Sequence, residues 1–249
     1  MGNVYRKDTA LKHTKLMDEK YHCDINTSID NTKIYDKDFI LSERPNGNPH
    51  IIMDDIDTVS AIFKYHSDNN IAALNFASYK HPGGGFINGS MAQEEALCHS
   101  STLYNVLSKF DNFYEENKNY TNKGLYTNRG LYSPNIIFID EEKGLNTTCN
   151  IITVAAPNRS VGLKYKNVTD KENLIALHDR IRFIINIVID NNIDTLILGA
   201  FGCGVFKQNP NQVADCFKQE LTLAPFKTVI FAIPDNNKLN AFKSTFVNA

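Results

Sequence analysis

The 249-residue chain contains no tryptophan and only five cysteines, and no two of these cysteines form a CxxC pair. Without such pairs the sequence offers neither a disulfide framework nor a structural zinc site, so we expect a reduced protein that binds no metal. The chain also lacks an apolar run of membrane-spanning length, and no apolar segment typical of a signal peptide follows Met1. We therefore expect a cytoplasmic protein with no membrane partner.

An excess of charge of one sign is missing as well. The 26 basic and 28 acidic residues leave a formal net charge of −2. Proteins that bind nucleic acid usually carry a basic surface, so we expect no direct nucleic-acid partner. The sequence also contains no GxGxxG or Walker motif, the usual signatures of dinucleotide and nucleoside-triphosphate sites. A nucleotide ligand would have to be held by local geometry.

The length fits one α/β domain with an extension at its N-terminus. Residues 1–49 are polar and weakly periodic, and we predict a short helix over 9–21 followed by irregular structure. From residue 50 onward the pattern changes to apolar strands alternating with helices. We therefore predict an N-terminal extension, 1–49, packed on a main domain, 50–249, and we expect a monomer.

Alternation of strands and helices dominates the predicted domain. Several strands are continuous apolar runs, which indicates a mainly parallel sheet covered on both faces. The predicted strands are 50–53, Ile71–Phe76, 136–139, 151–155, Thr195–Leu198 and 228–233. The predicted helices are 57–66, 92–110, 174–190, 212–223 and 238–246, and the Asn/Lys/Tyr-rich segment up to Ser133 is predicted to be a loop.

Two predicted strands run directly into glycine-rich loops. Three consecutive glycines let the backbone approach a ligand and offer N–H groups to an anion, although a flexible turn explains most isolated triplets. Ligands of parallel sheets bind beyond the carboxyl ends of the strands, so two such loops predict an elongated phosphorylated ligand. The first loop holds Gly83, Gly84 and Gly85, and the second holds Gly202, Cys203, Gly204, Val205 and Phe206.

Gln93, Glu94 and Glu95 follow the glycine triplet at the predicted start of a helix. The helix dipole favours acidic residues there, so their presence alone does not require catalysis. Ordinary glycosidases place two carboxylates on opposite sides of the scissile bond, about 5–9.5 Å apart. Adjacent residues are splayed by about 100° around one helix and could not readily bracket a sugar. A division of labour fits better, with one glutamate binding sugar hydroxyls and the other transferring the proton.

Four other residues have alternative interpretations. Cys203 has no histidine nearby in the sequence, so tight packing is a better explanation than a nucleophile. Phe206 could pack in the core or lie against a ribose, and Asn75 could anchor the loop or contact a ribose. Asp57 is most economically a helix N-cap, although it could accept a hydrogen bond from an adenine amino group.

Taken together, these segments resemble the bacterial-type poly(ADP-ribose) glycohydrolases, a branch of the macrodomain fold. That family carries a glycine triplet, a spacer of six to eight residues and then Gln-Glu-Glu, and here seven residues, 86–92, form the spacer. The flanks LNFASYKHPGGGF and ALCHSSTLY match as well. The later blocks TLYNVL, LYSPNIIF, ITVAAPN and LGAFGCGVF follow in the family's order, so the resemblance covers roughly Asp54 to the C-terminus.

The resemblance implies a macrodomain-like three-layer α/β/α fold with a mixed, mainly parallel central sheet, and ADP-ribose or poly(ADP-ribose) as the ligand. It implies Glu95 as the acid that protonates the ribose–ribose glycosidic oxygen and Glu94 as the residue that holds ribose hydroxyls, without a cofactor or metal. The implied substrate-binding residues are Gly83, Gly84 and Gly85 near the distal ribose and diphosphate, Gly202, Cys203, Gly204 and Val205 around the diphosphate, Phe206 beside the distal ribose, and Gln93 and Asn75.

The expected activity is exo-type release of ADP-ribose from the polymer. Two alternatives stay open, namely hydrolysis of mono-ADP-ribose or of a related signal nucleotide, and a non-catalytic ADP-ribose-binding macrodomain. The paired glutamates favour a hydrolase, because binding alone needs only the glycine loops. For the adenine, Phe231, Asp235 and Asn236 at the end of the last strand are the candidate contacts.

Overall fold

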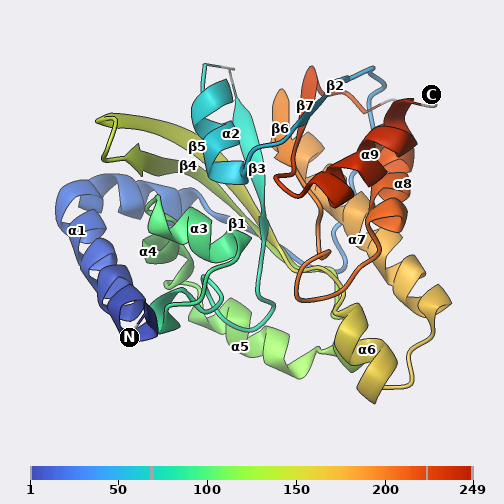
Figure 1. The fold of residues 1–249 in the computed structure, drawn as a ribbon, viewed down its shortest axis with the longest axis horizontal. Coiled ribbons are helices and arrows are strands. Elements are labelled where there is room, and N and C mark those ends of the chain that lie inside the picture. The colour runs from blue at the N-terminus through green and yellow to red at the C-terminus, as the bar shows by residue number, and fades with distance from the viewer. Residues whose placement is uncertain (1, 68–69, 223, 248–249) are drawn as a thin grey trace.

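The computed structural model describes residues 2–67, 70–222 and 224–247. A seven-stranded sheet in the order β1-β4-β5-β3-β6-β7-β2 runs through its centre (Figure 1). The strands are Lys33–Tyr35 (β1), His50–Asp54 (β2), Ile71–Phe76 (β3), Gly130–Asp140 (β4), Leu145–Val154 (β5), Thr195–Leu198 (β6) and Thr228–Ala232 (β7). The helices are Gly2–Asn31 (α1), Thr58–Tyr65 (α2), Gln93–His99 (α3), Leu103–Leu107 (α4), Asp111–Asn119 (α5), Arg159–Tyr165 (α6), Asp170–Asp190 (α7), Pro210–Leu221 (α8) and Asn236–Val247 (α9), with 3-10 turns at Phe86–Asn88 (η1) and Asn122–Gly124 (η2).

The sheet is mixed and mainly parallel, as predicted. Strands β5, β3, β6, β7 and β2 pair in parallel, whereas β4 is antiparallel to both β5 and β1. In the parallel register Phe76 faces Val154, and Leu198 faces Phe231. The carboxyl ends of β3, β5, β6 and β7 therefore meet at one edge of the sheet.

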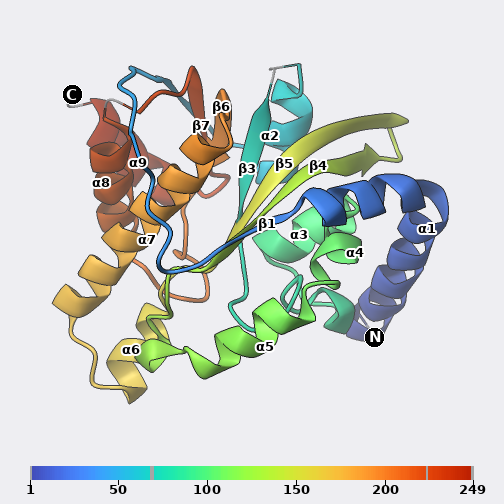
Figure 2. The same cartoon turned by 180° about the vertical axis from the view of Figure 1, so that it is seen from behind.

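Each face of the sheet is covered by its own layer of helices. Successive residues of a strand point to opposite faces, so Ala72 and Leu74 of β3 join one core while Ile71 and Ala73 join the other. Helices α7, α8 and α9 cover the first face, and α1 to α4 lie on the second (Figures 1 and 2). The result is the three-layer arrangement expected of an apolar parallel sheet.

The N-terminal region is more ordered than predicted. Helix α1 extends well beyond the predicted 9–21 on both sides, with a kink at Tyr21 (φ −127°). Its buried stripe consists of Ala10, Met17 and Ile25, one residue in about two turns, which explains the weak periodicity of the sequence. Strand β1 was not predicted at all, because it contains three residues and is held by backbone pairing with β4. The division of the chain at residue 49 stays a prediction.

The predicted helix 92–110 is wrong, since it is broken into α3 and α4. The break occurs at Ser101, whose backbone forms an isolated bridge with Phe138 of β4. The Ser101 hydroxyl donates to the carbonyl of Leu97 at 2.7 Å and accepts from the amide of Leu103 at 3.1 Å. These bonds satisfy the backbone at the break, so two short helices replace one long helix.

The predicted loop before Ser133 is also wrong. It contains α5, η2 and the first residues of β4. The helix was missed because only three of its residues are buried, in a segment that is otherwise polar. Strand β4 is longer than the predicted 136–139, and its register with β5 shifts between Ser133 and Ile136, where Asn135 adopts a left-handed φ of 55°.

The C-terminal half follows the prediction more closely. Helix α7 begins four residues before the predicted start, at a capping box formed by Thr169 and Glu172. Helix α8 begins with Pro210, and its predicted end at Leu223 lies outside the described residues. Within the described ranges, the helices include none that is long and apolar enough to cross a membrane.

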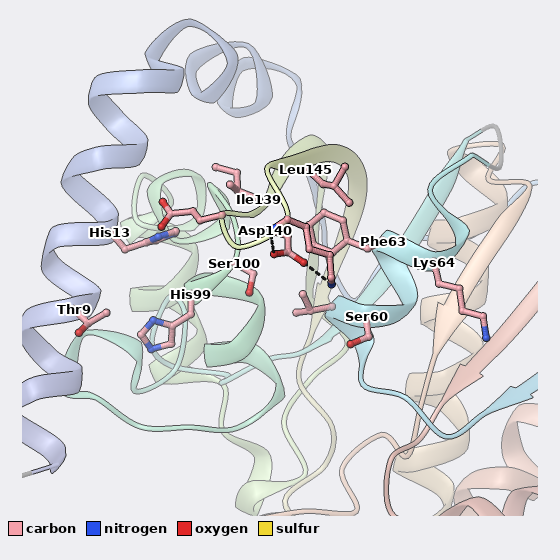
Figure 3. A pocket seen from close by; sticks show the side chains of 13 residues that line it. Thr9, His13, Ser60, Phe63, Lys64, His99, Ser100, Ile139, Asp140 and Leu145 are labelled. Carbon is pink, nitrogen blue, oxygen red and sulfur yellow. Dashed lines mark hydrogen bonds and ion pairs between the residues drawn. The ribbon is translucent and has the colours of Figure 1, made fainter.

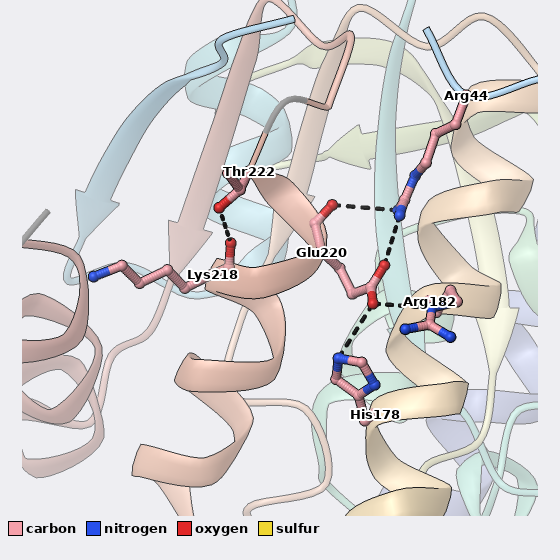
Figure 4. Close-up of polar contacts among 6 residues, drawn as sticks. All are labelled: Arg44, His178, Arg182, Lys218, Glu220 and Thr222. Atoms are coloured by element: carbon pink, nitrogen blue, oxygen red, sulfur yellow. Dashed lines mark hydrogen bonds and ion pairs between the residues drawn. The ribbon is translucent and has the colours of Figure 1, made fainter. Parts of the chain in front are cut away.

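The side chain of Glu220 connects the segment between β1 and β2 to helices α7 and α8 (Figure 4). Its side chain is 4% exposed and accepts from Arg44 at 2.7 Å and from Arg182 at 3.0 Å. His178 lies 3.2 Å from the same carboxylate. Arg44 also donates to the Glu220 carbonyl at 3.2 Å, so one buried carboxylate joins the linker, α7 and α8.

Glu220→Gln is expected to lower the free energy of unfolding by about 2 kcal/mol, because neutralisation weakens several charge-assisted hydrogen bonds at once. Urea denaturation at neutral pH measures the effect. Glu19→Gln is the matched control, because Glu19 is 62% exposed and its pairing with Lys15 should contribute less than about 0.5 kcal/mol. Equal effects of the two substitutions would contradict a structural role of Glu220.

Candidate active site

Three adjoining cavities lie along the carboxyl edge of the sheet. The glutamate cavity, about 660 Å³, contains both Glu94 and Glu95 in its wall. The connecting cavity, about 150 Å³, lies beside the 202–206 loop, and the Asp57 cavity, about 410 Å³, lies beyond it. Phe76 and Ala92 line all three, so the cavities form one elongated groove at the edge where the parallel strands end.

The two glutamates are buried, at 3% and 7% exposure, and are held differently. Oε2 of Glu94 accepts from the Ser78 amide at 2.7 Å, and its Oε1 accepts from Nδ2 of Asn75 at 3.2 Å. Oε1 of Glu95 accepts from the Gly85 amide at 2.8 Å. Oε2 of Glu95 accepts no hydrogen bond from any described residue. Glu94 is therefore anchored through both oxygens, whereas Glu95 keeps one oxygen available to the cavity.

Burial raises the pKa of Glu94 to about 8, and the neighbouring Glu95 carboxylate adds to the rise. The hydrogen bonds from Ser78 and Asn75 act in the opposite direction. The raised pKa favours the protonated form of Glu94. The pKa by itself would favour Glu94 as an acid, while the hydrogen bonding favours Glu95, which is the glutamate with an unengaged oxygen.

The glycine turn is folded directly against these carboxyl groups. Gly83 and Gly84 adopt left-handed φ angles of 64° and 61°. A Cβ on Gly84 would lie 2.7 Å from Oε1 of Glu95 and 2.8 Å from Oε2 of Glu94. Such separations are too short for a real side chain, so only glycine permits this approach.

Gln93 and Asn75 hold the glutamates in place. Oε1 of Gln93 accepts from the Phe76 amide at 2.8 Å, and its Nε2 donates to the Leu74 carbonyl at 2.8 Å. Gln93 thus fastens the first turn of α3 to the end of β3, while its side chain also lines the connecting cavity. Asn75 is fully buried and its Nδ2 donates to Glu94, while its contact with a ribose stays a prediction.

The second predicted loop forms the wall between the cavities. Gly202, Gly204, Val205 and Phe206 line the connecting cavity, and a Cβ on Gly204 would meet nothing within 4 Å. Cys203 differs from them, because its thiol is buried and contacts the Phe201 carbonyl at 3.7 Å. Burial raises the pKa of Cys203 to about 12, which makes it a packing residue and a poor nucleophile.

The Asp57 cavity forms the far end of the groove. Asp57 caps α2 by accepting from the Ser60 amide at 2.8 Å, as predicted, and it also lines this cavity. Asp235 lines the same cavity, whereas Phe231 is completely buried against other phenylalanine rings. Phe231 is therefore wrong as a candidate for stacking on adenine.

Some residues of the glutamate cavity were not found from the sequence, and three of them matter most for its shape. Ser78 supplies the backbone donor to Glu94, and Tyr79 and Tyr126 form part of the wall. Ser78 and Tyr79 follow β3 in the quoted block LNFASYK, so their proximity to the strand end was a usable signal. Tyr126 lies in the polar segment interpreted as a loop, where no periodicity marks it.

A separate cavity of about 640 Å³ lies between α1, α2 and the β4–β5 turn (Figure 3). His99, at the opposite end of α3 from the glutamates, is one of its lining residues. Among its charged groups, Asp140 pairs with Lys143 at 2.7 Å and Lys64 pairs with Asp54 at 2.6 Å. None of its lining residues is a glycine, so the groove is the better candidate for the active site.

The mixed sheet between two helical layers, with a ligand groove at its carboxyl edge, defines a macrodomain-like α/β/α protein. The family model described as the microbial-type PARG catalytic domain matches residues 8–141, more than half of the chain. The chain belongs to this family. Because the match begins at residue 8, the family likeness reaches into the N-terminal region, beyond the stretch from Asp54 that the motifs indicated.

Solved structures match almost the whole chain. The poly(ADP-ribose) glycohydrolase from Thermomonospora curvata is 26% identical, with a TM-score of 0.87 over 97% of this chain and 99% of that chain. The same protein bound to the inhibitor ADP-HPD gives a TM-score of 0.86 at 26% identity, with the same coverage. The Deinococcus radiodurans protein in complex with ADP-ribose is 28% identical, with a TM-score of 0.81 over 90% and 97% of the two chains. Among curated proteins, none matches.

The raised pKa of Glu94 predicts a pH-dependent stability. Between about 4.5, the ordinary value, and about 8, the folded protein keeps a proton that the unfolded chain releases. The free energy of unfolding should therefore fall by a few kcal/mol as pH rises through this window, and the contribution is fully present only below it. Urea denaturation from pH 4.5 to 9 measures the slope. Glu94→Gln should flatten it, and an unchanged slope in that variant would contradict the assignment.

Proposed function

We propose that this chain is a poly(ADP-ribose) glycohydrolase that hydrolyses the ribose–ribose O-glycosidic bond and releases ADP-ribose from the end of the polymer. The observation that carries the proposal is the pair of buried glutamates packed against a glycine turn at one end of an elongated groove. Family membership supports it, as does the binding of ADP-ribose by the Deinococcus relative.

The groove suits a ligand with a nucleoside at one end, a sugar at the other and an anionic centre. In this proposal the adenine end lies in the Asp57 cavity, where Asp57 and Asp235 offer hydrogen-bond acceptors. The diphosphate lies in the connecting cavity, beside the backbone of Gly202 and Gly204. The distal ribose then reaches the glutamate cavity, beside Phe206.

Glu95 is the general acid in this mechanism. Its Oε2 is the carboxyl oxygen that can present a proton to the glycosidic oxygen, because both oxygens of Glu94 are engaged by Ser78 and Asn75. Water then attacks the oxocarbenium-like ribose and returns a proton to Glu95. The anchored Glu94 orients the ribose hydroxyls.

Glu95→Gln is expected to lower the rate of ADP-ribose release from polymer by about 10³-fold, because it removes the transferable proton. Affinity for ADP-ribose should change less than about threefold, since the glycine loops stay intact. Mass analysis of the products and calorimetric titration measure the two effects. Glu142→Gln, on the exposed β4–β5 turn, is the matched control.

Other outcomes would change the acid, the function or the substrate that we propose. If Glu94→Gln abolishes turnover while Glu95→Gln retains it, the acid is Glu94. If the wild type binds ADP-ribose but releases none from polymer, the protein is a binding module. Turnover restricted to mono-ADP-ribosylated protein or to a signal nucleotide would replace the polymer as the substrate.

Gly84→Ala tests the close approach of the turn. The added methyl group must displace the carboxyl groups of Glu94 and Glu95, so turnover should fall by about 100-fold. Gly144→Ala is the matched control, because Gly144 has a similar φ of 63° with nothing within 4 Å of its Cβ position. Both variants should lose about 1 kcal/mol of stability from the left-handed backbone. Equal turnover in the two variants would show that the contact is unimportant.

A further inference from the structure

Tyr126 adopts a backbone conformation that an aromatic residue rarely takes. Its φ is 61°, in the left-handed region where a Cβ crowds the backbone. The residue lies between η2 and β4, and its half-buried ring lines the glutamate cavity. Strained residues persist only where their surroundings impose the strain, and they concentrate at functional sites.

The buried side chain of Arg180 holds the backbone around Tyr126 in this conformation. Arg180 is 1% exposed, and its guanidinium donates to Oδ1 of Asn128 at 2.6 Å and to the carbonyl of Leu125 at 3.3 Å. It donates as well to the carbonyl of Ala155 at the end of β5. Arg180 is thus hydrogen-bonded to the chain on both sides of Tyr126 and connects this segment to the sheet.

Arg180 forms no ion pair with any acidic residue in the described part of the chain. Burial lowers its pKa to about 10, so it stays protonated at neutral pH. Burying a cation without a carboxylate partner is costly, and neutral carbonyl and amide oxygens offset the cost only in part. An apolar side chain would occupy this position at a lower cost in free energy, so the buried cation of Arg180 points to a role in holding the segment around Tyr126.

Aromatic neighbours also hold the ring of Tyr126 in place. It stacks on Tyr79 with centroids 4.2 Å apart and an interplanar angle of 12°. The Tyr79 hydroxyl is hydrogen-bonded to the Thr127 hydroxyl at 2.7 Å, which connects the stacked rings to the same segment. The Tyr126 ring also lies 6.2 Å from the ring of Phe206 at 59°, so the two rings form an aromatic corner in the wall of the glutamate cavity.

We infer that Tyr126 is a substrate-binding residue that, together with Phe206, packs against the distal ribose of ADP-ribose, and that Arg180 is its positioning residue. The inference rests on the proposed function, because it assumes that the glutamate cavity holds a ribose. A rigid ring restricts where the sugar can lie relative to Glu95. Strain in the backbone is the cost of placing that ring in the cavity.

Calorimetric titration with ADP-ribose and turnover of polymer test the ring. Tyr126→Ala should weaken ADP-ribose affinity about fivefold or more and raise KM for polymer, whereas Tyr126→Phe should stay within about twofold of wild type. Tyr120→Ala is the matched control, because that tyrosine is 54% exposed in the same segment and should leave affinity unchanged.

Tyr126→Gly separates binding from folding. Glycine adopts a left-handed φ without strain, so this variant should melt at a higher temperature than Tyr126→Ala. Its affinity for ADP-ribose should nevertheless be as weak as that of Tyr126→Ala, because both lack the ring. Equally weak binding by two variants of different stability cannot be explained by unfolding.

A double-mutant cycle tests Arg180. Arg180→Lys keeps the charge but cannot reach three separate acceptors, and it should weaken ADP-ribose affinity about fivefold in the wild type. In the Tyr126→Ala background it should have no further effect on affinity, because the ring through which it acts is absent. An equal loss in both backgrounds would overturn the positioning role.

Failure of this inference can be distinguished from failure of the proposed function. If the wild type binds ADP-ribose and hydrolyses polymer while Tyr126→Ala and Tyr126→Gly match its affinity and KM within twofold, the inference is wrong and the proposed function stands. If the wild type neither binds ADP-ribose nor cleaves polymer, both fall together.

Discussion

Two carboxyl groups lie buried against the Gly83–Gly85 turn, and backbone amides of the adjoining loop donate hydrogen bonds to them. Taking two acidic groups out of water is costly unless donors replace the solvent or a proton is retained. The structure uses both means, because Glu94 receives amide hydrogen bonds and has a raised pKa. The donors can come this close only because Gly84 has no side chain, so the glycine turn and the glutamates depend on each other.

Elements far from the groove keep this turn and helix α3 in register. Gln93 fastens α3 to the end of β3, and Phe86, the residue after the glycines, is completely buried. Helix α1 supports the same region from outside. His13 is hydrogen-bonded to the Ser101 carbonyl at 2.9 Å, and its ring packs against Phe86. The N-terminal helix therefore belongs to the framework of the site, which agrees with a family match that starts at residue 8.

The wall of the glutamate cavity is held by hydrogen bonds from two directions. The glutamates accept hydrogen bonds within the β3–α3 unit. The segment that carries the aromatic corner is held by Arg180, which reaches from α7 to the residues before β4. In the proposed reaction, such preorganisation positions a substrate for proton transfer.

The sequence by itself determined the features that have a local pattern. Continuous apolar runs identified the β3 and β6 strands, and the spacing from the glycine triplet to Gln93 located the glutamates. Tertiary structure alone decided the rest. Strand β1 exists through its ladder with β4, and Arg180 contacts partners 25 to 55 residues away in the chain. Periodicity reports which face of an element is apolar, but it carries no information about which distant backbone groups an isolated polar side chain will reach.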